Sequence, residues 1–399
     1  MSDRRKKILF VIESLKVAGG ERSLVTLLNE LDYSRLDVDL QLMDFQGGLQ
    51  KYIPPQVNVL PPLDYIEFLL GNRSGSLSMW LSRIMFSVEF RMEAQKLFYI
   101  RARKWWKTSK RHLLQLPTEY DVAIAYSQCI PTFYVVEKVK AKKKIGWVNC
   151  IFHLRGKDQQ WQEQYYNALD NIVLVSQQAL SHFTSVYPCF RDKMLLYSDL
   201  ISAKTINYLS DEGGDPYTDE ETKPRLLTVA RLDDKDKGYD ITLDACRILK
   251  ERGIPFKWYA LGEGSYRPEI EEYIKVNGLQ DYFELLGTTP NPYPYIKNCT
   301  IYVQTSRHEG FGLSIAEARI LNRPVVTTAF DSVYNQMVPN KNGLVVPIDS
   351  IAVADAIQRL LTDKSLYDSI VQYQRQEKKG NLEEIEKFYQ LIDERTNSN

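Results

Sequence analysis

The sequence predicts an α/β fold in which two doubly wound, Rossmann-like domains follow one another. Residues 8–12 form an apolar run that leads into a glycine pair and a helical pattern, and residues 225–230 start the same order again. A third apolar run at residues 301–303 precedes another glycine turn and helix. Short apolar runs that alternate with helices are typical of buried parallel strands. Ligands of such sheets bind beyond the carboxyl ends of the strands, so the turns should carry the chemistry.

Length and composition agree with this fold class. The 399 residues are enough for two ordinary domains, and 44% of them are hydrophobic. Lys and Arg together number 51, as do Asp and Glu, so net charge predicts no nucleic-acid partner. The five cysteines include no C-x-x-C pair, which indicates neither a disulfide framework nor a zinc site. No apolar stretch is long enough to span a bilayer, and we expect a cytoplasmic protein.

The first domain is expected over residues 1–205. Its predicted strands are residues 8–12, 38–43, 120–126, 144–148 and 171–176. Between the first strand and a helix over 23–31 stand Gly19 and Gly20, a strand–glycine–helix order that suits the approach of a phosphate. The G-x-G-x-x-G fingerprint is absent, which disfavours a dehydrogenase.

Two aspartates, Asp37 and Asp39, form a D-x-D pattern at the start of the second strand. This pattern binds a metal ion in some sugar transferases. Here the two carboxylates lie two residues apart on a strand, and we predict that they face solvent on one side of it. No metal site is therefore predicted.

A basic, aromatic helical insert occupies residues 73–113. From Arg83 to Arg111 it contains nine Lys or Arg residues against two Glu, interleaved with Trp and aliphatic residues. Such a segment favours binding to a membrane surface. The alternative is a helix pair that packs on the domain with solvated cations, and the sequence leaves both interpretations open.

An acidic, turn-rich stretch at 206–224 is interpreted as a linker or exposed loop. The second domain is expected over 225–380, and residues 381–399 are expected to form a last helix that crosses back to the first domain. Predicted strands of the second domain are residues 225–230, 256–261, 283–287, 301–303, 324–328 and 343–347.

The most informative stretch is residues 306–318. The pair of glycines before the helix allows close backbone approach, and the first amides of a helix lack internal partners. This geometry suits a phosphate oxygen. Glu309 before the turn and Glu317 inside the helix are poorly placed for a phosphate, but both suit sugar hydroxyls. A diphosphate with a sugar at each end has this form, which is the form of a nucleotide-sugar.

Glu309 and Glu317 resemble the E-x7-E signature of retaining glycosyltransferases with the GT-B fold, the family numbered four. The resemblance implies two domains that face each other across a cleft, with Glu309 on donor-sugar hydroxyls and Glu317 on the ribose. The donor site that it implies also includes the residues between them, Gly310, Phe311, Gly312 and Leu313.

The start of the second domain resembles the same family's G-R-L…K-G element, with Ala230 where glycine is usual. The resemblance implies that Arg231 and Lys237 hold the diphosphate, since fixed cations stabilise the charge of the leaving group. Lys235 is a rival to Lys237. Gly262, in a Gly-x-Gly turn, is expected to bring its backbone close to the nucleotide.

In the first domain the resemblance implies that the amides of Gly19 and Gly20 face the donor diphosphate or the acceptor. Family members often place a histidine or an acid after the strand at 144–148. Asn149 stands at that position here, and His153 follows four residues later. Both remain candidates for contact with the donor hexose.

The resemblance implies a metal-independent hexosyltransferase that uses a UDP- or GDP-sugar and no other cofactor. Expected partners are a glycan or polyprenyl-diphosphate-linked acceptor in capsule or exopolysaccharide assembly, at the inner face of the cell membrane. Catalytic roles fall on Glu309, Arg231 and Lys237. Two alternatives stay open: a non-hydrolysing nucleotide-sugar epimerase of the same fold, and a non-catalytic scaffold.

Overall fold

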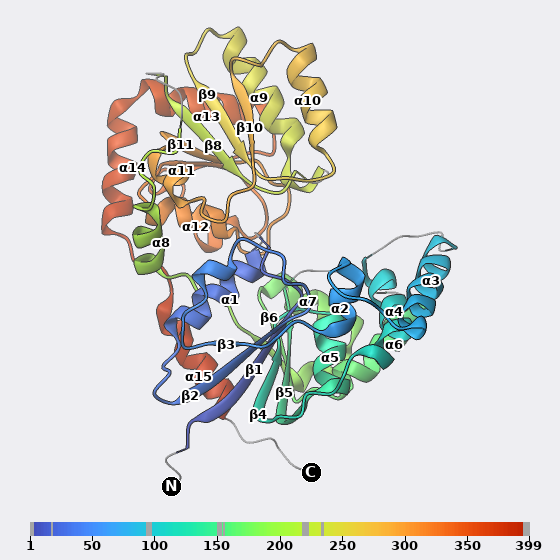
Figure 1. Cartoon of the computed structure of the whole chain (residues 1–399). Helices are drawn as coiled ribbons and strands as arrows, with labels where there is room; N and C mark the ends of the chain where they lie inside the picture. The colour runs from blue at the N-terminus through green and yellow to red at the C-terminus, as the bar shows by residue number, and fades with distance from the viewer. Residues whose placement is uncertain are drawn as a thin grey trace. The chain divides into compact units, whose positions relative to one another are not determined.

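A computed structural model divides the chain into two compact units, each built on its own parallel sheet (Figure 1). Unit 1 comprises Met1–Leu200 and Leu382–Asn399, and unit 2 comprises Ile201–Asn381. The structure describes residues 4–16, 19–92, 98–149, 154, 156–217, 223–232 and 235–393. Two parallel sheets flanked by helices confirm the predicted α/β class.

The sheet of unit 1 has seven strands in the order β3-β2-β1-β4-β5-β6-β7, and all neighbours are parallel. Its strands are β1 (Lys6–Ile12), β2 (Leu36–Leu42), β3 (Asn58–Val59), β4 (Glu119–Ala125), β5 (Lys140–Val148), β6 (Asn171–Leu174) and β7 (Met194–Leu196). The chain starts near the middle, runs to one edge and then returns to build the other, which is the doubly wound order.

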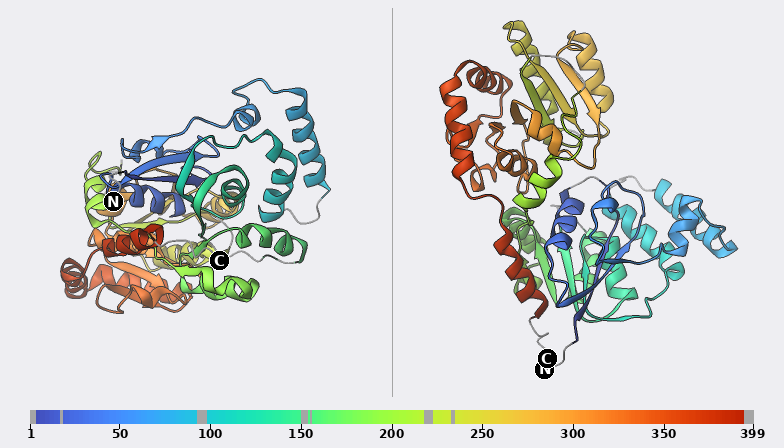
Figure 2. Two further views of the ribbon diagram at one scale, coloured as in Figure 1. Left: turned by 90° about the horizontal axis from the view of Figure 1, so that it is seen from below. Right: turned by 60° about the vertical axis from the view of Figure 1, so that its left-hand side comes forward.

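Helices cover both faces of this sheet (Figures 1 and 2). The helices of unit 1 are α1 (Gly19–Glu30), α2 (Asp64–Leu70), α3 (Leu77–Arg91), α4 (Phe98–Ser109), α5 (Ile130–Lys138), α6 (Gly156–Asn167), α7 (Gln177–Val186) and α15 (Ile385–Asp393). Side chains alternate along β1, so Phe10 packs with α1 and α15 whereas Leu9 packs with α2, α4 and α5. Both faces are therefore apolar, as a buried parallel strand requires.

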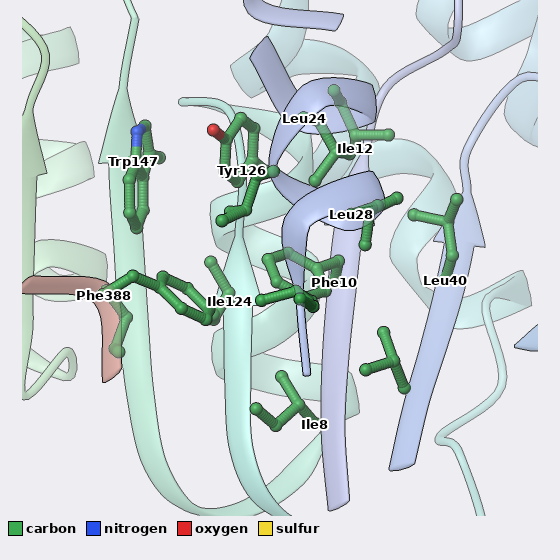
Figure 3. Close-up of a cluster of buried hydrophobic side chains, with 14 of the residues drawn as sticks. Ile8, Phe10, Ile12, Leu24, Leu28, Leu40, Ile124, Tyr126, Trp147 and Phe388 are labelled. Atoms are coloured by element: carbon green, nitrogen blue, oxygen red, sulfur yellow. The ribbon is translucent and has the colours of Figure 1, made fainter. Parts of the chain in front are cut away.

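The last helix, α15, completes the core of unit 1 (Figure 3). Phe388 is fully buried, and its ring stacks on that of Phe10 with 6.0 Å between centroids. The ammonium groups of Lys143 and Lys6 donate to the carbonyls of Leu391 and Ile392, each at 2.7 Å. Cations at a helix C-terminus satisfy carbonyls that lack intrahelical donors. Helix α15 is thus held by both packing and charge.

The sheet of unit 2 has six parallel strands in the order β10-β9-β8-β11-β12-β13. Its strands are β8 (Arg225–Val229), β9 (Lys257–Leu261), β10 (Phe283–Gly287), β11 (Ile301–Gln304), β12 (Val325–Thr328) and β13 (Gly343–Val346). The order makes β8 and β11 neighbours, although the chain visits β9 and β10 between them. The turns after β8 and β11 therefore leave the same edge of the sheet.

Helices also cover both faces of the unit 2 sheet. They are α8 (Ala203–Ser210), α9 (Tyr239–Glu251), α10 (Arg267–Val276), α11 (Tyr293–Asn298), α12 (Leu313–Ile320), α13 (Ser350–Thr362) and α14 (Lys364–Gln376). One hydrophobic cluster joins the sheet to α9, α10, α13 and α14, and another joins its opposite face to α8, α11 and α12. Within the described ranges, no helix combines the length and the apolar character needed to cross a membrane.

The stretch interpreted as a linker at 206–224 differs in the structure. It begins inside α8, and unit 2 starts already at Ile201. The hydroxyl of Ser202 caps α8 by accepting from the amide of Thr205 at 3.2 Å, and Ile206 is buried in unit 2. The capped helix and the burial of Ile206 make the start of this segment part of unit 2, although its composition is polar. Residues 218–222 lie outside the described ranges.

The prediction that both aspartates of the D-x-D pattern face solvent is wrong for Asp39. This residue is buried, and its carboxylate accepts from the Tyr120 hydroxyl at 2.8 Å and from the Asn58 side-chain amide at 2.7 Å. Asp37 is half-exposed and lies 3.9 Å from the Lys7 ammonium. The partners of Asp39 come from β3, which is adjacent, and from β4, which lies beyond β1. The sequence of one strand could not reveal them.

Replacing Phe388 with alanine should lower the free energy of unfolding of unit 1 by about 3–5 kcal/mol, because it removes a fully buried ring from the core. Urea denaturation followed by fluorescence measures this change. Tyr208→Ala is the matched control, since Tyr208 is 69% exposed and should shift stability by less than about 0.5 kcal/mol. Equal effects of the two substitutions would contradict the assignment of α15 to the core.

Candidate active site

The turns after β8 and β11 are hydrogen-bonded to each other at the carboxyl edge of the unit 2 sheet. The backbone amide of Arg307 donates to the carbonyl of Asp236 at 2.8 Å, and the Thr305 hydroxyl donates to the carbonyl of Gly238 at 2.9 Å. The Arg307 guanidinium also forms a bidentate pair with Asp240, at 2.8 and 2.6 Å. The hydrogen bonds from Arg307 hold the pKa of the Asp240 carboxyl below its usual range. The two turns therefore form one platform.

Glu309 lies at the centre of this platform. Its Oε1 oxygen accepts from the Lys237 ammonium at 2.8 Å, from the Ser306 hydroxyl at 2.7 Å and from the Gln304 side-chain amide at 3.1 Å. The side chains of Lys237 and Glu309 are 19% and 14% exposed. A largely desolvated carboxylate needs such partners, because an unpaired buried charge is costly.

Buried side chains of β11 orient the donors to Glu309. Gln304 is buried, and its amide oxygen accepts from the Tyr302 hydroxyl at 2.7 Å. Burial raises the pKa of Tyr302 well above its usual value, so its hydroxyl stays protonated and remains a donor. With its oxygen occupied, Gln304 directs its NH₂ group to Ser306 at 2.7 Å and to Glu309. The network fixes which end of the amide faces the carboxylate.

The backbone of the loop is held from β12 and the segment that follows it. The Thr328 hydroxyl donates to the carbonyl of Ser306 at 2.6 Å, and the Ser332 hydroxyl donates to the carbonyl of Glu309 at 2.8 Å. Buried backbone carbonyls need such partners. Glu309 is therefore positioned through both its carboxylate and its main chain.

Helix α12 begins immediately after this loop, as the sequence predicts. Gly312 is its N-cap and has a left-handed conformation with φ 81°, which glycine adopts without steric cost. The Gln336 side-chain amide donates to the carbonyl of Gly312 at 3.1 Å and also to that of Phe311. Inside α12, Glu317 is 4% exposed, and its carboxylate accepts from the Tyr293 hydroxyl at 3.4 Å. Leu313 is the first residue of the helix.

The two predicted cations of the β8 turn differ in their surroundings. Arg231 lies just beyond β8 with an exposed side chain, whereas Lys237 ends a short 3-10 turn and contacts Glu309. Lys235, the rival to Lys237, has a side chain outside the described part of the structure. The structure thus places Lys237 in contact with the predicted sugar-binding carboxylate.

Gly262 lies where the turn after β9 touches the turn after β8. A Cβ atom at this position would lie 1.9 Å from the carbonyl oxygen of Ala230, so only glycine permits the approach. Hydrogen bonds reinforce it: the amide of Gly262 donates to Gly287 at 2.7 Å, and the amide of Leu232 donates to Glu263 at 3.0 Å. Three adjacent turns are therefore packed backbone to backbone.

The remaining candidates belong to unit 1. Gly19 and Gly20 form the first turn of α1 and do not precede it as a loop. A Cβ on Gly20 would lie 2.9 Å from the Asn149 side-chain nitrogen, which donates to the Tyr126 carbonyl at 2.7 Å. The side-chain oxygen of Asn149, Oδ1, is buried without a hydrogen bond in the described structure. His153 lies outside the described residues.

Sequence analysis did not identify the side chains that support Glu309. They are Tyr302, Gln304, Ser306, Thr328, Ser332 and Gln336. One signal was available, because Gln304 ends an otherwise apolar buried strand, and a buried amide must find partners. Thr328, Ser332 and Gln336 come from β12 and the residues after it, and only the fold brings them to the loop.

The chain is similar to known glycosyltransferases. Residues 223–363 match the family model described as "Glycosyl transferases group 1". The chain is 28% identical over 223 residues to the putative colanic acid biosynthesis glycosyltransferase WcaL of Escherichia coli, covering 48% of this chain and 55% of that one. It is 27% identical over 199 residues to the alpha-D-kanosaminyltransferase of Streptomyces kanamyceticus, covering 46% and 51%.

The chain thus spans about half the length of these relatives. Among solved structures, Alr3699/HepE of Anabaena, in complex with UDP and glucose, superposes with a TM-score of 0.65 over 97% of this chain and 99% of that one, at 16% identity. That likeness concerns the fold alone. Together the matches confirm the resemblance to group 1 glycosyltransferases with the GT-B fold, and they are consistent with the family-four type.

Replacing Gln304 with leucine should lower the free energy of unfolding by about 1–3 kcal/mol, because the buried Tyr302 hydroxyl loses its nearest acceptor and Ser306 and Glu309 lose a donor. Adding Tyr302→Phe should recover only part of this loss, since it removes the hydroxyl but leaves Ser306 and Glu309 without the amide. Urea denaturation of the single and double variants measures the coupling. Additive losses would contradict the proposed link between the two side chains.

Proposed function

We propose that the protein is a retaining glycosyltransferase that moves a hexose from a nucleoside diphosphate sugar to a glycan acceptor. The contact between Lys237 and Glu309 carries this proposal. It joins the cation expected on the diphosphate to the acid expected on the sugar, in the domain that matches group 1 glycosyltransferases. A single small site thus has groups suited to both parts of the donor.

The ion pair suggests how the donor is recognised. Lys237 and Glu309 neutralise each other across 2.8 Å. A bound diphosphate offers Lys237 a stronger anionic partner, and hexose hydroxyls offer Glu309 new donors. Exchange of the internal pair for the donor keeps both charged groups hydrogen-bonded. Ser306 and Gln304 hold Glu309 during this exchange, because their contacts do not involve Lys237.

In the transfer step, the bond between the anomeric carbon and the phosphate oxygen breaks, and a bond to the acceptor oxygen forms on the same face of the sugar. The acceptor proton passes to the departing phosphate oxygen. Negative charge grows on the diphosphate as the bond breaks, so Lys237, Arg231 and the first amides of α12 would stabilise the transition state. These side chains and amides supply the charge stabilisation, and we propose that no metal ion is needed.

The relatives support a polysaccharide as the product class. WcaL is described as a putative colanic acid biosynthesis glycosyltransferase, and HepE was solved with UDP and glucose. We propose a UDP-hexose as the first donor to test and a polyprenyl-diphosphate-linked glycan as the acceptor. A lipid-linked acceptor would require the enzyme to act at the inner face of the cell membrane.

A panel of UDP- and GDP-sugars, with polyprenyl-diphosphate-linked sugars as acceptors, tests the function through released nucleoside diphosphate. Lys237→Met and Glu309→Gln should each lower kcat/KM for the active pair by about 100-fold or more. The control is Lys364→Met, which removes a lysine that is 87% exposed and paired with Asp368 and should leave the rate unchanged.

Three outcomes would overturn the proposal. Full activity of Glu309→Gln would remove its proposed role. Conversion of a nucleotide-sugar without any acceptor would indicate an epimerase. A product whose anomeric configuration is inverted in its NMR spectrum would exclude the same-face mechanism.

Treatment with excess EDTA should leave the transfer rate within about twofold of its starting value, because Lys237, Arg231 and helix amides take the role that a divalent cation would have. The measurement compares initial rates before and after chelation and gel filtration. A loss that Mg²⁺ or Mn²⁺ restores would show that the protein cations are insufficient.

A further inference from the structure

The outward face of α3 carries an apolar stripe that stays largely exposed among the described residues. Seven of its large hydrophobic side chains are between 48% and 81% exposed, counting the C-cap residue. They are Leu77, Trp80, Leu81, Ile84, Met85, Val88 and Met92. Their spacing of three and four residues places them on one side of the helix. Single exposed hydrophobics are ordinary, but a contiguous stripe marks an interaction surface.

The opposite side of α3 already packs on the protein. Ser82 is buried, and the Phe86 and Phe90 rings are half-buried and stacked at 5.8 Å. The helix therefore has apolar residues on two opposite sides. Only the inner side is satisfied by the fold of unit 1.

Hydrogen bonds and ring contacts fix α3 in place. The Ser82 hydroxyl accepts from the Arg111 guanidinium at 2.8 Å, and Lys104 donates to the carbonyl of Glu89 at 2.7 Å. The Trp80 ring meets the edge of Phe68 at 5.0 Å. The outward stripe is thus held in a preformed geometry. Figures 1 and 2 show α3 at the outer edge of unit 1, with α4 between it and the sheet.

Positive charge flanks the stripe. The exposed cations on α3 and on the turn after α4 are Arg83, Arg91 and Arg111, of which Arg83 lies over the Trp80 ring and Arg111 donates to Ser82. Among the described residues of these segments, the single acid is Glu89, and its side chain is half-buried. An apolar helix face edged by arginines has the composition of a helix that lies in the headgroup region of an anionic bilayer.

We propose that α3 docks the protein on an anionic lipid surface, with its apolar stripe below the headgroups and its cations among the phosphates. A ridge on a single outer helix can sink into fluid lipid, whereas a protein partner would need a groove of matching shape. The purpose of this surface rests on the proposed function, since a polyprenyl-linked acceptor stays in the bilayer. The binding itself needs neither donor nor acceptor.

Co-sedimentation of the full chain with vesicles tests the docking surface. The chain should partition onto vesicles of phosphatidylglycerol and phosphatidylcholine, and much less onto pure phosphatidylcholine. Leu77→Gln with Ile84→Gln should lower the partition coefficient by about tenfold or more, because two apolar side chains no longer enter the lipid. Arg91→Gln should weaken binding to the anionic vesicles by about fivefold, because one cation no longer meets the lipid phosphates.

The matched control is Val276→Gln with Ile351→Gln. These residues of unit 2 are 71% and 56% exposed, and Leu77 and Ile84 are 76% and 56% exposed. All variants should keep the parent melting temperature, since they change exposed side chains. Equal loss of binding in the control pair, or no partition of the parent onto anionic vesicles, would overturn the proposal.

Sedimentation velocity tests whether a second copy of the chain, and not lipid, covers the stripe. A dimer of the parent chain that Leu77→Gln with Ile84→Gln dissociates would show that a second copy covers α3, and it would overturn lipid docking. Transfer to a water-soluble acceptor separates the two proposals. Normal transfer without vesicle binding would refute only the surface, whereas vesicle binding without transfer by any donor would refute only the proposed function.

Discussion

The Oε1 oxygen of Glu309 is the point on which the candidate site depends. An ionised carboxylate with little access to water is stable only when donors surround it, and here a cation, a hydroxyl and an amide do so. Lys237 and Glu309 are 72 positions apart in the chain, so their contact also ties the turn after β8 to the turn after β11. Electrostatics and loop structure are therefore coupled at one atom.

This coupling follows from the topology of a parallel sheet. The carboxyl ends of all strands meet at one edge, so turns that are remote in sequence become neighbours there. Hydrogen bonds between backbone groups, from Arg307 to Asp236 and from Gly262 to Gly287, turn these neighbours into a continuous platform. In unit 1 the same rule brings the start of α1 next to Asn149. Each unit thus presents polar groups at the corresponding edge of its own sheet.

The fold leaves apolar residues of α3 exposed to solvent. Burying one side of the helix against unit 1 satisfies Phe86 and Phe90, but it turns Leu81 and Ile84 toward solvent. Exposed apolar area of this kind remains unfavourable until something covers it. A bilayer can cover it without a matching shape, and a lipid-linked acceptor would be found at the same surface. The proposed docking and the proposed reaction are therefore compatible, although each can fail alone.

Several features could be predicted from the sequence because they depend on local pattern. Apolar runs such as residues 301–303 indicated buried strands, and Gly312 before a helical pattern indicated where α12 begins. Glu309 and Lys237 could be singled out, since charged residues in glycine turns after such strands are where ligands of this fold class bind. Short-range rules suffice for features of this kind.

The tertiary structure decided which groups meet. Asp39 on β2 meets Asn58 of β3 and Tyr120 of β4, and Glu309 meets Lys237 because β11 is bordered by β8. Strand order and long-range packing are properties of the whole chain, so no local window contains them. The sequence alone therefore determined the helices, the strands and the residues able to take part in chemistry. Folding determined the partners and the burial of these residues, and it left the apolar stripe of α3 exposed.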